Sequence, residues 1–284
     1  MFGMTELPTM RSRRLGRELA ALREGKNMTM GEVAAHLHCG QPKVSKIESG
    51  HQSVRPLDLD LMLTLYGVED PPTREAFVRL SRQVRQQDWW SSQGPLLWED
   101  LKDYLTLEAD SSLTRTYEFH VLPGLLQTPD YMREVFRPNR SLREIDVMME
   151  TRQKRQDFFI ARGTRVRLII DVAALHRVVG SSKIMHAQLD RVLDMAQMPN
   201  LSIQVLPLRV PMQVPGQYAP YTIFTMAEAP HAEYVWLEHL TGATVLEREQ
   251  DVTRYKQAWD DHTAAASPPG ESLKYISEVM KEFA

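Results

Sequence analysis

Hydrophobic residues at helical spacing predict four helices within the first 70 residues of the chain. Leucines recur at i, i+4 and i+7 over residues 15–22, and this pattern ends at Gly25. The second pattern begins with a capping box at residues 29–32, where a Thr hydroxyl and a Glu carboxylate satisfy the free amides of a new helix. The third pattern covers residues 41–50, and the fourth covers residues 55–66.

The short second and third helices are joined by a three-residue turn at positions 38–40, which is typical of a helix-turn-helix. The third helix directs Val44 and Ile47 inward and leaves a polar face exposed. Gln bonds adenine bidentately, Lys donates to guanine, and an apolar side chain contacts a thymine methyl group, so this face is suited to the major groove. The predicted base-reading residues are Gln41, Pro42, Lys43 and Lys46.

Helical spacing continues over residues 73–86, where apolar residues alternate with arginines. We interpret this segment as a linker helix that leads to Trp89 and Trp90, two side chains too large to leave exposed without cost. The Trp pair is predicted to anchor the linker on the following domain. The predicted parts of the chain are a helix-turn-helix domain at residues 9–70, a linker helix at 71–90 and a C-terminal sensing or interaction domain at 91–284.

The C-terminal part alternates between helical and strand patterns. Strands are predicted at residues 116–121, 166–171, 201–206, 221–226, 234–239 and 243–246. Helices are predicted at residues 97–107, 128–136, 141–162, 182–197, 249–265 and 271–282. The strand, helix, strand order over residues 166–206 predicts a right-handed parallel pair. The predicted fold class is α+β overall, with an all-α helix-turn-helix bundle followed by a mixed α/β domain.

A length of 284 residues, with 43% hydrophobic and 25% charged residues, excludes a disordered tail and a lone DNA-binding module. The longest strongly apolar stretch is interrupted by Arg167 and Asp171, so we expect no membrane span. Cys39 alone forms no disulfide within the chain, and no signal-peptide pattern occurs near the N-terminus. We therefore expect a cytoplasmic, nucleoid-associated protein.

The formal net charge of −3 hides an uneven distribution along the chain. Residues 11–55 carry nine Lys and Arg against four Glu, which gives +5, whereas residues 201–284 carry six basic against eleven acidic residues, which gives −5. A basic module on an acidic body is typical of a DNA-binding protein whose second domain has a different role.

The segment MTMGEVAAHLHCGQPKVSKIESG, residues 28–50, resembles the helix-turn-helix of the Xre family. The resemblance implies a lambda-repressor-like fold in which Gln41, Lys43 and Lys46 face bases. It also implies that the loop after the third helix and the start of the fourth helix hold phosphates. The predicted phosphate-contacting residues are Thr29, Ser45, Ser53 and Arg55. His38 stands where the family's turn usually has Gly, and His tolerates a left-handed conformation better than most residues do.

The rest of the chain resembles the large C-terminal domain of actinobacterial WhiJ-like developmental and antitoxin-like regulators. The matching stretches include VLPGLLQTPDYMREV from Val121, TRQKRQDFF from Thr151 and EHLTGATVLEREQDVTRYKQAWD from Glu238. Proteins of this kind are commonly encoded beside a small acidic protein, which implies such a partner here. Val172 departs from the pattern, because the family usually carries an acid at that position.

No Walker loop, dinucleotide-binding glycine motif, nucleophile elbow or zinc-binding motif occurs in the sequence, so we predict neither an enzyme nor a cofactor. Arg152 and Arg155 are a candidate ligand or anion site in the long helix, and the alternative is a solvated face with internal ion pairs. His36, His38 and Cys39 offer three ligands without a fourth nearby, so no metal site is predicted.

These features lead to three hypotheses for function. The first is a sequence-specific transcription regulator, expected to be a repressor, whose C-terminal domain binds a partner protein or ligand that modulates DNA binding. The second is an antitoxin-like interaction protein that neutralises a partner and autoregulates its operon. The third is an enzyme fused to a DNA-targeting module. One short helix reads too few bases for useful specificity, so we expect a homodimer on an inverted-repeat operator in double-stranded DNA.

Overall fold

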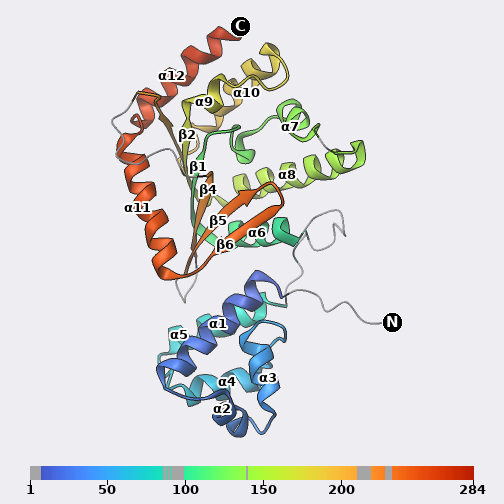
Figure 1. Cartoon of the computed structure of the whole chain (residues 1–284), viewed down its shortest axis with the longest axis vertical. Coiled ribbons are helices and arrows are strands. Elements are labelled where there is room, and N and C mark those ends of the chain that lie inside the picture. The colour runs from blue at the N-terminus through green and yellow to red at the C-terminus, as the bar shows by residue number, and fades with distance from the viewer. Residues whose placement is uncertain are drawn as a thin grey trace. The chain divides into compact units, whose positions relative to one another are not determined.

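The computed structural model describes residues 8–85, 88, 90, 99–138, 140–209, 219–227 and 232–284 of the chain. Within this part, the chain divides into two compact units, and the boundary between them in the sequence is near residue 92 (Figure 1). The first unit is all-helical, and the second combines a mixed sheet with helices. The predicted fold class is therefore confirmed.

The N-terminal unit contains, among the described residues, α1 (Met10–Gly25), α2 (Met30–His36), α3 (Gln41–Glu48), α4 (Pro56–Leu65) and α5 (Pro71–Gln83). The four helices predicted from hydrophobic spacing are confirmed. The predicted capping box forms at the start of α2, where the Glu32 amide donates to Thr29 Oγ1 and the Thr29 amide donates to Glu32 Oε2 at 2.7 Å. His38 adopts the left-handed backbone conformation of the turn, with a φ of 49°.

Apolar side chains from all five helices form the core of this unit. The segment interpreted as a linker helix forms α5, and its Phe77 and Leu80 are each only 2% exposed within this core. α5 therefore packs as the fifth helix of the bundle, against α1 and α4. Spacing alone does not distinguish the two roles, because an amphipathic helix that packs on a bundle has the same pattern as one that connects two domains.

Two glycines allow the backbone at the end of α3 to contact the backbone of α1. A Cβ atom at Gly16 would lie 2.3 Å from the carbonyl oxygen of Glu48, which is too close for any side chain. Gly50 has a φ of 78°, and a Cβ atom there would lie 2.8 Å from the Arg13 amide nitrogen. Glycine is required at both positions, and the end of α3 is therefore seated directly on the backbone of α1.

The C-terminal unit is built on a sheet whose described strands are β1 (Ser111–Glu118), β2 (Arg165–Asp171), β3 (Leu201–Leu206), β4 (Tyr221–Met226), β5 (Glu233–His239) and β6 (Gly242–Leu246). Their order across the sheet is β3-β2-β1-β4-β5-β6. β2 pairs in parallel with both β1 and β3, and the predicted parallel pair of β2 and β3 is confirmed. β4, β5 and β6 extend the sheet through antiparallel pairs.

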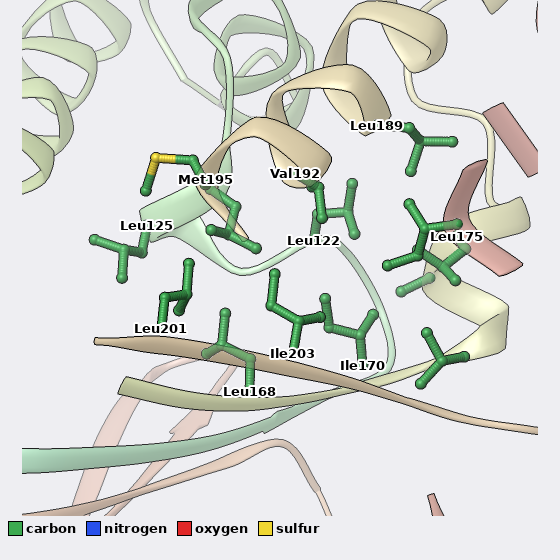
Figure 2. Close-up of a cluster of buried hydrophobic side chains, with 14 of the residues drawn as sticks. Leu122, Leu125, Leu168, Ile170, Leu175, Leu189, Val192, Met195, Leu201 and Ile203 are labelled. Carbon is green, nitrogen blue, oxygen red and sulfur yellow. The ribbon is translucent and has the colours of Figure 1, made fainter. Parts of the chain in front are cut away.

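Helices cover both faces of this sheet (Figure 1). On one face, Trp259 packs in a cluster with Tyr221 and Val235. On the other face, Figure 2 shows Leu189 and Val192 above the side chains of β2 and β3, in the larger of the described clusters. The elements are α6 (Glu99–Asp110), the 3-10 helix η2 (Gly124–Leu126), α7 (Pro129–Phe136), α8 (Leu142–Arg162), α9 (Val172–His176), α10 (Ser182–Met195), α11 (Glu249–Ala265) and α12 (Pro269–Glu282).

Among the described elements, the clearest differences from the sequence prediction are at β1 and α9. β1 begins at Ser111 instead of residue 116, because α6 passes into the strand without an intervening Gly or Pro to mark the change. The Ser111 hydroxyl donates to the Leu107 carbonyl at 2.6 Å and satisfies the end of α6. The short helix α9 is an addition, and it begins where the Ala173 amide donates to Asp171 Oδ1 at 2.8 Å.

Gly16→Ala is expected to destabilise the N-terminal unit by about 2 kcal/mol or more, because the new Cβ atom clashes with the backbone of α3. The measurement is the free energy of unfolding of the full chain in urea. Gly25→Ala is the matched control at the end of the same helix, where a Cβ atom would meet nothing within 4 Å. Equal stabilities of the two variants would contradict the close contact of α1 and α3.

Candidate nucleic-acid interface and C-terminal pocket

The residues of α3 divide into a buried stripe and an exposed face. Val44 and Ile47 are buried in the core of the N-terminal unit. Four of the predicted DNA-contacting residues are exposed on this helix: Gln41, Pro42, Ser45 and Lys46. α3 therefore presents an amide, a hydroxyl and an ammonium group to its surroundings, and these are groups that bond base edges and phosphates.

Lys43 differs from the other predicted base readers. It is half-buried, and its Nζ donates to Asp58 Oδ2 of α4 at 2.6 Å. For Lys43 to contact a guanine or a phosphate, its ammonium group must therefore leave Asp58 or use its other N–H donors for the new contact. In the described structure the pair links α3 to the start of α4.

A buried ion pair fixes the C-terminal end of α3. Arg23 Nε donates to Glu48 Oε1 at 2.8 Å, and Arg23 Nη2 donates to Glu48 Oε2 at 3.0 Å. The two side chains are only 9% and 4% exposed, and the hydrogen bonds that Arg23 donates to the Glu48 carboxylate raise the pKa of Arg23. Arg23 Nη1 also donates to the carbonyl of Met28 at 2.8 Å. One guanidinium therefore connects α1, the segment before α2, and α3.

The remaining predicted phosphate-contacting residues lie close to helix starts. Thr29 is the exposed residue before α2, and its hydroxyl donates to Glu32 Oε2 at 2.8 Å within the capping box. Ser53 is exposed in the loop before α4, and Arg55 is the exposed residue that precedes this helix. Within the described part of the chain, the side chains of Ser53 and Arg55 make no hydrogen bond or ion pair, so both are available to a ligand.

The C-terminal unit contains a pocket of about 660 Å³. Its walls come from α6, α7, α8, residues 121–127 and the turn between β5 and β6, and its floor comes from β1, β2, β4 and β5. Arg152 and Arg155, the predicted ligand or anion site, both line this pocket. Lys154 between them is paired with Glu150 at 2.6 Å on the solvated side of α8. α8 therefore has an internal ion pair on its solvated side, and the role of its two pocket-lining arginines as a ligand or anion site stays a prediction.

Arg155 is held by groups from α6. Its Nε donates to Glu108 Oε2 at 2.5 Å, and its Nη2 donates to Glu108 Oε1 at 2.7 Å and to the Tyr104 hydroxyl at 2.9 Å. Burial opposes the charge of Arg155, but the Glu108 carboxylate outweighs burial, and the pKa of Arg155 is raised. Arg155 is therefore a neutralised cation that joins α8 to α6.

Arg152 has neutral partners. Its Nη1 donates to Gln127 Oε1 at 2.5 Å, and its guanidinium carbon lies 4.4 Å from the ring centroid of Phe136. None of the described carboxylates forms an ion pair with this group. Burial, followed by the charge of Arg155, lowers the pKa of Arg152 to about 10. At neutral pH the pocket therefore contains a cation without a paired anion.

Gly124 lies against the two guanidinium groups, and a side chain at this position would crowd Arg152. A Cβ atom at Gly124 would lie 3.1 Å from Arg152 Nε and 3.4 Å from Arg155 Nη1. Gln127 is 2% exposed, and its Nε2 donates to the Leu122 carbonyl at 2.6 Å. This bond directs Gln127 Oε1 toward Arg152, so the hydrogen-bond acceptor is fixed before any ligand arrives.

The floor of the pocket is a polar strip of the sheet. Thr116 of β1 and Thr222 of β4 are opposite each other in the strand register, and their hydroxyls lie 3.1 Å apart. Glu118 follows on the same face and accepts hydrogen bonds from two backbone amides. Burial raises the pKa of Glu118 to about 7, and the Glu238 carboxylate contributes to the shift. Glu118 is therefore a carboxyl group that titrates near neutral pH.

No pattern in the sequence identifies the residues that surround the two arginines. Glu108 and Tyr104 lie 47 and 51 residues away from Arg155 in the sequence, so no local spacing connects them. The available signal was the separation of Arg152 and Arg155 by three positions, which places both on one face of a helix. That signal identifies a pair of arginines but not the carboxylate that neutralises one of them.

The remaining sequence predictions concern the Trp pair, Cys39, a metal site and a membrane span. Trp89 lies outside the described residues and Trp90 is buried, and their role as an anchor between domains stays a prediction. Cys39 packs against the core of the N-terminal unit. In the described ranges, no group of three or more His, Cys, Asp or Glu side chains is arranged to hold a metal ion. Nor does any described helix combine the length and apolar composition needed to cross a bilayer.

Two protein-family models match the chain. The model described as "Domain of unknown function (DUF5753)" matches residues 101–278, which is more than half of the chain. The model described as "Helix-turn-helix domain" matches residues 14–77, so the helix-turn-helix predicted from the sequence is confirmed. No curated protein matches the chain.

Glu118→Gln is expected to change how stability depends on pH. In the folded chain the pKa of Glu118 is about 7, against an ordinary value of 4.5 for a glutamate carboxyl. Its contribution to stability is therefore full below about pH 4.5 and declines until about pH 7. The variant lacks this decline. The difference in free energy of unfolding between the two chains, variant minus native, should therefore increase by about 1–3 kcal/mol from pH 5 to pH 8.

Urea unfolding of both chains at the two pH values provides the measurement. Glu271→Gln, at an exposed position in the first turn of α12, controls for the loss of a carboxylate elsewhere. A difference between native and Glu118→Gln chains that stays constant from pH 5 to pH 8 would show that Glu118 titrates normally.

Proposed function

Because the chain belongs to the DUF5753 family and carries a helix-turn-helix domain, we propose that it is a sequence-specific transcription regulator whose C-terminal domain senses a ligand. In this proposal the N-terminal unit is of the Xre type, the C-terminal domain is WhiJ-like, and the protein acts as a repressor. A small acidic protein, implied by the resemblance, is a further proposed partner.

The observation that carries the DNA-binding role is the exposed polar face of α3. Gln41 and Lys46 are exposed, while Val44 and Ile47 are buried and Glu48 is fixed by Arg23. A recognition helix needs this combination, because base reading requires side chains that reach the groove from a rigid support. The net charge of +5 over residues 11–55 favours approach to the DNA backbone.

The observation that supports a sensing role is the pocket of about 660 Å³ in the C-terminal unit. Small-molecule sites are concave and combine an apolar lining with a few fixed polar groups. Arg152 and Gln127 supply such polar groups, and both are held in place by the protein itself. Ligand binding affects DNA binding only where the ligand has different affinities for the DNA-bound and free arrangements of the chain.

Lys46→Ala and Gln41→Ala are expected to weaken binding to the specific site by about 1–3 kcal/mol each and to relax the preference at particular base pairs. The specific site is first obtained by selection from random DNA with the full chain. Affinity is then measured for that site and for each of its single-base-pair variants. Unchanged affinity and unchanged base preference in both variants would contradict base reading by α3.

Arg55→Ala serves as the comparison, because its proposed contact is with a phosphate. This variant should weaken binding evenly across sequences and reduce the slope of log affinity against log salt by about one unit. A loss confined to one base pair would instead assign Arg55 to base reading.

The chain is expected to bind DNA as a homodimer, with half-sites about 10 base pairs apart or at a multiple of that spacing. The physical reason is that the short helix α3 covers too few base pairs for specificity in one half-site. Light scattering of the full chain at micromolar concentration, with and without the selected DNA, gives the stoichiometry. A monomer that binds a single half-site one to one would exclude the dimer.

A further inference from the structure

We propose that the C-terminal pocket binds a small organic acid, with a single carboxylate at the Arg152 guanidinium and an apolar body against the apolar part of the pocket wall. The inference rests on the proposed function, because it names the ligand class of the proposed sensing domain. Four features of the pocket carry it: the charge of Arg152, its free donors, the surrounding acidic groups and the apolar wall.

The charge balance of the pocket singles out Arg152. Arg155 is already neutralised by two hydrogen bonds to Glu108. Arg152 bonds an amide oxygen of Gln127 and stacks on Phe136, and no carboxylate in the described structure pairs with it. The Glu238 carboxylate acts on Arg152 from a distance, but the groups in direct contact with this half-buried cation are neutral. An anion that enters the pocket is therefore bound most favourably at Arg152.

The donors of Arg152 match a carboxylate. Only Nη1 has an acceptor among the described residues, which leaves Nε and Nη2 on the other edge of the guanidinium. This edge presents two parallel N–H groups, and a carboxylate accepts both in a fork. Because Gln127 and Phe136 already hold the guanidinium in position, little side-chain freedom is lost when the ligand binds.

The acidic residues of the pocket favour a single negative charge over two. Glu108, Glu118 and Glu238 all line it, and only Glu108 is engaged with an arginine of α8. A dianion such as a phosphate ester would bring its second charge near these carboxyl groups, whereas a monocarboxylate matches the one unpaired guanidinium. The acidic lining therefore favours a monoanion, such as a monocarboxylate, over a dianion.

The apolar part of the lining indicates the body of the ligand. Val121, Leu125 and Val135 line the pocket on one side, and Trp236 lines it from β5. A volume of about 660 Å³ lies within the range typical of small-molecule sites. A hydrated inorganic anion leaves this surface wet, whereas an aromatic or aliphatic acid covers it and gains hydrophobic energy.

Benzoate is the probe for this proposal, as an aromatic monocarboxylate. Isothermal titration of the full chain should show saturable binding of benzoate at pH 7.5, with acetate binding more weakly because it lacks the apolar body. Inorganic phosphate and sodium chloride at equal ionic strength should show no saturable binding. Arg152→Gln should weaken benzoate binding about tenfold or more, because the charged fork is lost.

Arg143→Gln is the matched control, since Arg143 is an exposed arginine in the first turn of the same helix. It should bind benzoate like the native chain. The proposal is overturned if benzoate does not bind, if Arg152→Gln binds it as tightly as Arg143→Gln does, or if inorganic phosphate binds more tightly than benzoate.

A measurement on the native chain covers the case in which Arg152→Gln does not fold. The Nε–H resonance of Arg152, assigned through bonds by nuclear magnetic resonance, should shift on titration with benzoate and remain in place with chloride. A resonance that does not move while benzoate binds would overturn the proposal. No DNA is present in either experiment, so a failure here is distinct from a failure of the Lys46 and Gln41 variants to alter DNA binding.

Discussion

The ion pair of Arg155 with Glu108 determines the arrangement of the C-terminal pocket. It joins α8 to α6 with side chains only 13% and 19% exposed, and removing one partner from such a pair typically costs about 3–5 kcal/mol. Because Glu108 bonds Arg155 with both oxygens, Arg152, three residues earlier, remains with neutral partners. The interaction that holds two helices together therefore also leaves a neighbouring charge available to a ligand. Gly124 leaves room beside them, since a Cβ atom there would lie 3.1 Å from Arg152 Nε and would require Arg152 to shift slightly.

The N-terminal unit uses the same kind of interaction for a different purpose. Arg23 and Glu48 form a buried pair between α1 and α3, and Gly16 lets the backbones of these helices touch. A recognition helix fixed at its C-terminal end loses little freedom when its exposed side chains meet DNA. Lys43 adds a constraint on the other side, because its pair with Asp58 ties α3 to α4. The support of α3 thus comes from paired charged residues, of which Arg23 and Glu48 are buried and Lys43 is half-buried.

Local patterns in the sequence predicted the elements well and the long-range contacts poorly. The capping box at Thr29 marked the start of α2, because its hydrogen bonds lie within three residues. The start of β1 was missed, because no turn residue separates it from α6. Arg152 and Arg155 were found as a pair, but the contrast between them depends on Glu108, 47 residues before Arg155. Such a pairing is a property of the folded chain, and no periodicity in the sequence encodes it.

The order of elements along the chain relates the C-terminal pocket to the N-terminal unit. α6 begins at Glu99, shortly after the N-terminal unit ends near residue 92, and it supplies both Glu108 and Tyr104 to Arg155. Among the pocket walls, α6 is therefore the element nearest in sequence to the DNA-binding unit. In the proposed complex, a carboxylate at Arg152 reduces the repulsion between the two guanidinium groups and so alters, through Arg155, the interaction of α8 with α6. Under the proposed function the effect is reciprocal by thermodynamic linkage: whatever factor such an acid imposes on DNA affinity, DNA imposes on acid affinity.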